Sequence, residues 1–152
     1  MKKIISAFLL CVMLLVPFNV FASESNSDAQ YIEYYEDGSY AIIEIVDSGI
    51  VARATGVTKS KTYTYYNSDN ERDWTVTVTG TFNYDGKTAT CTKSVTSSEI
   101  YNNSWKVTAS NASKSGAKAT GTFTVKKYWL GIPTKTENRT VTLTCSKDGK
   151  FS

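Results

Sequence analysis

Trp74-Thr75-Val76-Thr77-Val78-Thr79-Gly80-Thr81-Phe82 is the stretch that decides the fold of this 152-residue chain. Threonine alternates with apolar residues at two-residue spacing. In a β-strand, that spacing places the apolar side chains on one face and the hydroxyl groups on the other. Three shorter stretches repeat the pattern, at 88–92, 120–125 and 140–145. Each stretch therefore predicts a strand with one dry face and one solvent face.

Turn signals and β-prone runs extend this pattern in both directions. Glu36-Asp37-Gly38 separates the runs 31–35 and 39–46, which predicts a hairpin. A second turn is expected at Asn83–Gly86, a polar turn at 110–116 and a further turn at Leu130–Pro133. More strands, or extended connections, are expected at 51–55, 61–66, 94–101, 104–109, 117–129 and 134–145. Since no segment beyond the N-terminus has helical spacing, we expect an all-β fold, an antiparallel sandwich of about eight strands.

Two cysteines, Cys91 and Cys145, fall on the dry face by the same alternation. An even pair in an exported chain most simply forms a disulfide, so we expect one bridge between two sheets. Two free thiols are the alternative if the chain meets a reducing environment. Trp105 lies between the cysteines, as in immunoglobulin domains, where a tryptophan packs on the inter-sheet disulfide. Leu143 stands where that pattern has a tyrosine, so we expect only a general immunoglobulin-like architecture.

The N-terminus has the features of a secretory signal peptide, residues 1–22. Lys2 and Lys3 precede the apolar run 7–16, Pro17 ends that run, and Ala22 offers a cleavage point. An uncleaved anchor is the alternative, but the run is short for a membrane span of about 20 residues. We therefore expect an extracellular protein with no stable membrane insertion after cleavage.

Charge is distributed unevenly along the rest of the chain. Residues 23–52 contain no Lys or Arg and carry Glu24, Asp28, Glu33, Glu36, Asp37, Glu44 and Asp47, whereas residues 53–152 are predominantly basic. One explanation is an acidic hairpin lying on a basic sheet. The other is an acidic segment that masks a basic surface directed at anionic cell walls or membranes, which would suit a secreted, bacteriocin-like antagonist of other cells. We expect 53–152 to form the β-sandwich domain, with 23–152 as one folded unit.

The composition argues against most catalytic chemistry. The chain has no histidine, the usual general base beside a nucleophile and the usual nitrogen ligand of zinc. Paired carboxylates remain as a hydrolase hypothesis, and the candidates are Asp69, Glu71, Asp73, Asp85 and Glu99. Most of them lie in expected turns, where acids usually hold the turn. We expect a non-catalytic protein without metal or cofactor, and the scattered basic residues predict no nucleic-acid partner.

Aromatic residues beside a turn are the better candidates for binding. Tyr128 and Trp129 lead into the turn at 130–133 and follow Lys126 and Lys127. A tryptophan at a loop tip can stack on a sugar ring or lie in a membrane interface. The alternative is that Trp129 closes the open end of the core, where Trp74 and Trp105 are also expected. These four residues predict a site for carbohydrate or another cell-envelope polymer.

The overall pattern resembles a group of small secreted proteins of Gram-positive bacteria. The resemblance rests on Glu36-Asp37-Gly38-Ser39-Tyr40, on Lys61-Thr62-Tyr63-Thr64-Tyr65, on the stretch 74–82 and on Thr140-Val141-Thr142-Leu143-Thr144-Cys145. It covers most of residues 36–150. It implies extracellular location and a similar size, and it transfers no catalytic or binding residue.

Overall fold

The structure is a computed structural model that describes residues 30–47 and 56–152. The predicted signal peptide, 1–22, and the strand predicted at 51–55 lie outside these residues. The described strands are β1 (Gln30–Tyr34), β2 (Tyr40–Asp47), β3 (Val57–Tyr66), β4 (Arg72–Tyr84), β5 (Ala89–Ile100), β6 (Trp105–Ser115), β7 (Lys118–Trp129) and β8 (Ile132–Thr144). Within both ranges, no helix is long and apolar enough to cross a membrane.

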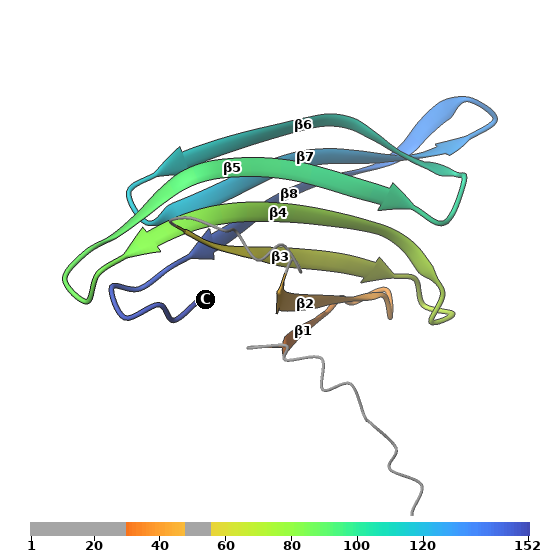
Figure 1. The fold of residues 1–152 in the computed structure, drawn as a ribbon. Helices are drawn as coiled ribbons and strands as arrows, with labels where there is room; N and C mark the ends of the chain where they lie inside the picture. Colours follow the sequence, from red (N-terminus) through yellow and green to blue (C-terminus); the bar gives the residue numbers. More distant parts are fainter. Residues whose placement is uncertain (1–29, 48–55) are drawn as a thin grey trace, which may run out of the picture.

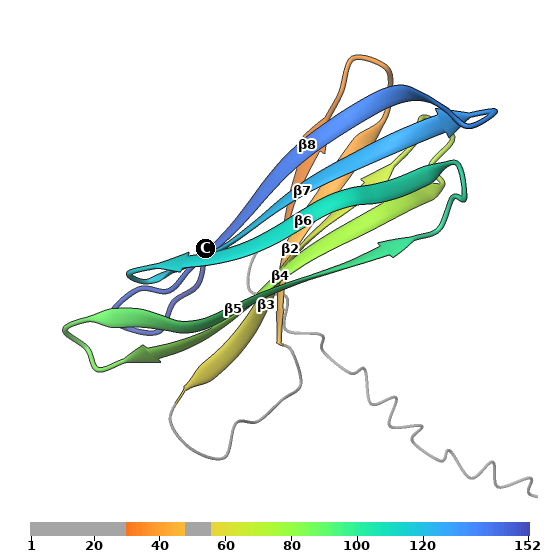
Figure 2. The same ribbon diagram turned by 90° about the horizontal axis from the view of Figure 1, so that it is seen from above.

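The strands form two antiparallel sheets, which confirms the predicted all-β fold. β1 to β5 make a five-stranded sheet and β6 to β8 a three-stranded sheet, each in the order of the sequence. The chain passes between the sheets once, after β5, and Figures 1 and 2 show them as two layers. Immunoglobulin domains instead use Greek-key connections. The expected immunoglobulin likeness therefore does not extend to the order of the strands.

Both sheets contribute their apolar faces to one core. Trp74, Val76, Val78 and Phe82 are completely buried, as the alternation predicted. The other buried apolar residues are Ala41, Ile45, Tyr63, Tyr65, Cys91, Trp105, Ala119, Phe123, Val125, Val141, Leu143 and Cys145.

On the opposite face of β3 and β4, hydroxyl groups pair across the strands. The pairs are Ser60–Thr79 at 2.7 Å, Thr58–Thr81 at 3.0 Å, Thr64–Thr75 at 3.1 Å and Thr62–Thr77 at 3.2 Å between oxygens. A one-residue slip of either strand would turn these hydroxyls inward, so the pairs and the core enforce the same register.

Cys91 and Cys145 are buried, but the structure does not contain the disulfide predicted between them. Both are free thiols. The Cys91 Sγ donates to the carbonyl of Lys93 at 3.2 Å, and the Cys145 Sγ donates to that of Ser146 at 3.3 Å. Each sulfur therefore has a main-chain partner in place of the other sulfur. Burial raises the pKa of both thiols.

The acidic hairpin predicted in 23–52 is present as β1, β2 and the turn between them. β2 pairs with β3 along its length, from Tyr40 opposite Tyr66 to Asp47 opposite Lys59. The hairpin therefore extends the larger sheet. Its turn reaches the other sheet, where the Asp37 carboxylate lies 3.4 Å from the Lys135 ammonium. The described part of the acidic segment is thus a structural part of the fold.

Candidate binding site

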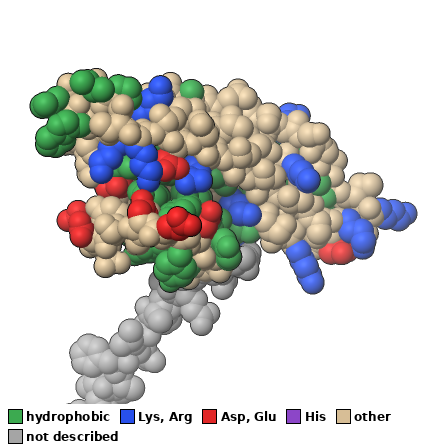
Figure 3. All heavy atoms as spheres, turned by 180° about the vertical axis from the view of Figure 1, so that it is seen from behind, with side chains coloured by type: hydrophobic (Ala, Val, Ile, Leu, Met, Phe, Trp, Pro, Cys, Tyr) green, Lys and Arg blue, Asp and Glu red, His purple; other side chains and the backbone are tan. Residues whose placement is uncertain are grey.

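The hairpin that joins β7 to β8 ends in exposed apolar side chains. Trp129 pairs with Ile132, and only Leu130 and Gly131 lie between them. Relative exposure is 71% for Trp129, 88% for Leu130 and 67% for Ile132. We call these three residues the hydrophobic tip. The hairpin extends past the neighbouring strands in Figures 1 and 2, and apolar side chains gather at this end in Figure 3.

The exposure of Trp129 decides between the two interpretations of this residue from the sequence, a binding residue and a core residue. The alternative in which Trp129 closes the open end of the core is wrong, because its side chain is exposed. Trp74 and Trp105, which are 0% and 2% exposed, are core residues as predicted. A large patch of exposed apolar surface usually marks a contact site.

The backbone of the turn is unusual for its sequence. Leu130 has φ 49° and Gly131 has φ 83°. Two consecutive positive φ angles define a tight hairpin turn that favours Asn-Gly, because asparagine and glycine tolerate this region. Leucine does so at a cost in conformational energy.

Four lysines surround the base of the hydrophobic tip: Lys106, Lys126, Lys127 and Lys135. We call them the lysine collar. Lys106 lies directly opposite Lys126 on the neighbouring strand, and Lys127 lies directly opposite Lys135. Like charges in such positions repel each other. The register therefore brings the four lysines into two like-charge pairs.

The lysines differ in what compensates their charge. Lys135 pairs with Asp37 at 3.4 Å and with Glu137 at 3.1 Å. Burial lowers the pKa of Lys135, but hydrogen bonds to Glu137 and Tyr65 outweigh burial and raise it overall. Lys106 and Lys127 have aromatic neighbours instead, the Tyr128 ring at 5.4 Å and the Trp105 ring at 5.7 Å from Nζ to centroid. In the described residues, no carboxylate lies within ion-pair distance of Lys106, Lys126 or Lys127.

The structure brings the four predicted residues together, but only one of them is fully exposed. Tyr128 is half-buried, and its N–H donates to the Ser104 carbonyl at 2.7 Å. Lys126 and Lys127 are adjacent on β7 and therefore point to opposite faces. Leu130 and Ile132 belong to the site although the sequence predicts only a turn there, and nothing adjacent in the sequence links Lys106 or Lys135 to it. The strand register alone identifies those two lysines as members of the collar.

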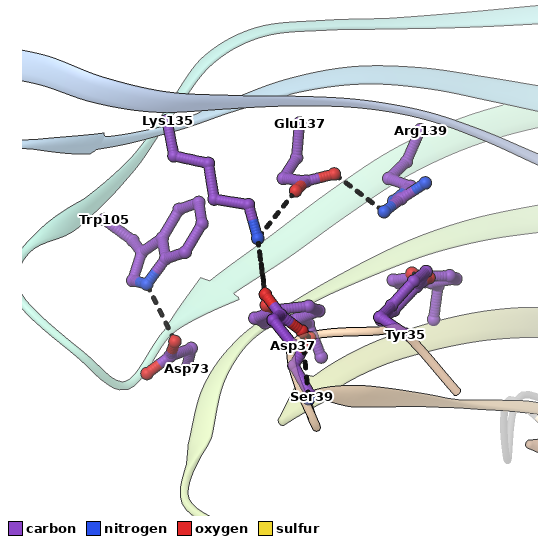
Figure 4. A network of polar contacts seen from close by, with 10 residues as sticks. Tyr35, Asp37, Ser39, Asp73, Trp105, Lys135, Glu137 and Arg139 are labelled. Carbon is purple, nitrogen blue, oxygen red and sulfur yellow. Dashed lines mark hydrogen bonds and ion pairs between the residues drawn. The ribbon is translucent and has the colours of Figure 1, made fainter. Parts of the chain in front are cut away.

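A polar network connects β8 to the larger sheet near this site (Figure 4). Glu137 lies between Lys135 and Arg139, with an Arg139 Nη2 to Oε2 distance of 2.7 Å. The Arg139 guanidinium lies 5.3 Å from the ring centroids of both Tyr35 and Tyr63. Burial raises the pKa of Tyr63. The charges of the network are paired within it, so its role is to hold the sheets together.

Two of the carboxylates considered for hydrolysis, those of Asp73 and Asp85, hold local structure through hydrogen bonds. Asp73 is buried, and its Oδ1 and Oδ2 each accept a hydrogen bond at 2.8 Å, from Asn102 Nδ2 and Trp105 Nε1. Asp85 accepts the N–H groups of Lys87 and Thr88 in the turn after β4. Glu71 borders the same hollow as Asp73, of about 480 Å³.

The other two candidates, Asp69 and Glu99, lie elsewhere in the larger sheet and its turns. Asp69 is in the turn before β4, where its N–H donates to the Asn67 side chain at 3.0 Å. Glu99 accepts a hydrogen bond from the Tyr101 hydroxyl. No group of three or more His, Cys, Asp or Glu side chains that could hold a metal ion occurs within 30–47 and 56–152. Comparison of the chain with protein-family models, curated proteins and solved structures finds no match.

Proposed function

We propose that this chain is an exported, non-catalytic protein that binds the cell envelope through the hydrophobic tip and the lysine collar. The observation that carries the proposal is the exposure of Trp129, Leu130 and Ile132 at the end of one paired hairpin. Apolar side chains in this position do not contribute to the core, so their burial is available for binding. The lysine collar favours an envelope component that carries negative charge.

The carboxylate-hydrolase hypothesis receives little support from the geometry. A general acid or base needs a free carboxylate oxygen that reaches a substrate. Both oxygens of Asp73 already accept hydrogen bonds, and Asp85 holds its own turn. Binding therefore explains the exposed groups better than hydrolysis does.

Replacing Trp129 with alanine should weaken envelope binding. The variant loses the largest apolar side chain of the tip, and an aromatic residue at the centre of a contact is typically worth about 2 kcal/mol or more. Since about 2 kcal/mol corresponds to about a 30-fold change in affinity, we expect about 30-fold less protein to co-sediment with isolated bacterial cell envelopes at sub-saturating protein concentration.

Tyr34→Ala is the matched control for this experiment. Tyr34 is an exposed aromatic residue, 75% accessible, in β1 of the other sheet. We expect its removal to leave co-sedimentation unchanged. Equal binding by wild type and Trp129→Ala would refute the proposed contact.

We also propose that an oxidant joins Cys91 and Cys145 after export. Their N–H groups donate to successive carbonyls of one turn, that of Gly116 at 2.7 Å and that of Ala117 at 3.0 Å, so both chain segments lie against this turn. Forming the bridge removes two protons and two electrons, which a disulfide of a small thiol can accept.

Alkylation with iodoacetamide tests this bridge. The reduced protein should react slowly when native, because burial and a raised pKa both limit the thiolate, and rapidly when unfolded in urea. Protein secreted into an oxidising medium should resist alkylation even in urea and should have an intact mass lower by two hydrogen atoms. Rapid alkylation of the secreted, unfolded protein would show that the bridge does not form.

A further inference from the structure

We propose that the envelope component is an anionic phospholipid bilayer, into whose surface the hydrophobic tip inserts reversibly while Lys106, Lys126 and Lys127 of the lysine collar lie on the lipid phosphates. This inference rests on the proposed function and specifies its ligand. Four properties of the hairpin support a bilayer as the ligand: side-chain chemistry, backbone pairing, depth and turn conformation.

The chemistry of the hydrophobic tip suits a lipid better than a sugar. A sugar-binding site combines an aromatic plane with several convergent polar side chains. Here one ring, Trp129, stands beside Leu130 and Ile132, and the next residue is Pro133. Aliphatic side chains gain most from an apolar phase, and tryptophan is enriched where that phase meets the head groups.

The backbone of the tip is paired up to the turn, after a register shift between Lys127 and Tyr128 that leaves Thr134 without a residue directly opposite it on β7. Because Trp129 pairs with Ile132, only the two residues of the turn lie beyond the last strand pair. Unpaired main-chain groups are the main cost of moving a peptide out of water. A two-residue turn therefore brings the apolar side chains to the lipid at a small backbone cost.

The spacing along β7 matches the depth of the lipid head groups. Lys127 and Lys126 lie three and four residues before Leu130, which corresponds to about 10–13 Å in an extended strand. An interfacial helix places its apolar face about 5–10 Å into the boundary between head groups and acyl chains. Leu130 can reach that boundary while the flexible lysine side chains extend to the phosphates.

The turn conformation points to a function for Leu130. Asparagine would suit its φ of 49° and the glycine that follows, yet this chain carries leucine there. Strain at a single exposed position is a reason to look for a function. In the bilayer complex, burial of the Leu130 side chain in lipid offsets the conformational energy of its positive φ angle.

Vesicle binding tests the inference directly. Vesicles of phosphatidylglycerol mixed with phosphatidylcholine should bind the exported chain, prepared without residues 1–22, at least about tenfold more tightly than vesicles of phosphatidylcholine alone. Added salt should weaken this binding. Lys126→Glu should weaken vesicle binding about tenfold. Lys87→Glu should not, because Lys87 lies in the turn between β4 and β5. That turn is at the opposite end of the molecule from the β7–β8 hairpin (Figures 1 and 2).

Leu130→Asn separates binding from folding. It should raise or preserve the melting temperature, since asparagine fits the turn, and it should weaken vesicle binding at least about tenfold. Val95→Asn is the matched control at an exposed apolar residue of β5, which is 42% accessible. Bromine-labelled phosphatidylglycerol should quench wild-type tryptophan fluorescence but not that of Trp129→Phe, because Trp74 and Trp105 are buried.

Two outcomes would overturn the inference. One is equal affinity for both kinds of vesicle, and the other is unchanged binding by Leu130→Asn. If the protein does not bind vesicles, but Trp129→Ala still binds cell envelopes more weakly than wild type does, the ligand is a wall polymer and the proposed function stands. If neither bilayer nor envelope requires Trp129, both proposals are wrong.

Discussion

Trp74→Ala is expected to lower the free energy of unfolding by about 4 kcal/mol, the usual cost of removing a buried tryptophan. Trp74 is completely buried and stacks on Tyr65 and Tyr63, with ring centroids at 5.1 and 5.5 Å. Trp105 packs against it at 6.0 Å from the other sheet. The substitution therefore opens a cavity where both sheets meet. Since domains have only about 5–15 kcal/mol of stability, we expect a large fall in the urea midpoint.

Trp74→Phe and Trp129→Ala are the controls for this prediction. The Trp74 Nε1 is buried and has no hydrogen-bond partner within the described residues, so phenylalanine removes an unsatisfied donor and leaves a smaller cavity. We expect it to cost less than half as much. Trp129→Ala removes the same side chain from an exposed site and should change stability by no more than about 0.5 kcal/mol. Far-UV circular dichroism follows all three variants without relying on tryptophan fluorescence. Equal effects of Trp74→Ala and Trp129→Ala would contradict the assignment of the core.

Asp73→Ala is the second substitution with a large expected effect, about 3 kcal/mol. It leaves the Trp105 Nε1 and the Asn102 side-chain amide without their acceptor in a buried site. Hydrogen bonds to a charged group contribute about 1.5–3 kcal/mol each, and unsatisfied buried donors add to the loss. Two further hydrogen bonds accepted by the Asp73 main-chain carbonyl, from Tyr101 and Asn102, should survive the substitution.

A double-mutant cycle with Trp105→Phe measures the specific contribution of this contact. The phenylalanine variant removes the Nε1 donor while it keeps an aromatic ring in the core. If the Asp73–Trp105 hydrogen bond stabilises the fold, the double variant should lose about 1–2 kcal/mol less than the sum of the single losses. Strict additivity would show that the two residues stabilise the fold separately.

The alternation in 74–82 was sufficient to predict the strand and its buried face, and the same alternation in 88–92 and 140–145 predicted the burial of both cysteines. It could not predict the length of the strands at the edges of the sheets. Residues 110–115 were expected to be a polar turn, yet they continue β6, and 94–100 continue β5. Each of these strands has one paired neighbour within its sheet, so polar residues suit it. Pairing with the adjacent strand outweighs the low β-propensity of serine and asparagine there.

The candidate site was predictable only as far as its residues are adjacent in the chain. Trp129 and the lysines before it stand next to an apparent turn, which was a usable signal. The four-residue turn expected at 130–133 is in fact a two-residue turn, because Leu130 adopts a positive φ angle. Nothing in the identity of leucine indicates that conformation. The Cys91–Cys145 disulfide was inferred from an even count and export, and the position of neither sulfur follows from these.

The sequential strand order affects how the chain can fold as it emerges from a ribosome or a translocation channel. Every sheet ladder joins consecutive strands, so each hairpin can form once its second strand is free. The contacts of β8 with β3 and β4 are different, because they wait for the last part of the chain. Until then, the apolar face around Trp74 has no cover from β8, and unfinished chains expose it to one another. The interval between the emergence of β4 and that of β8 is therefore the period in which aggregation competes with folding.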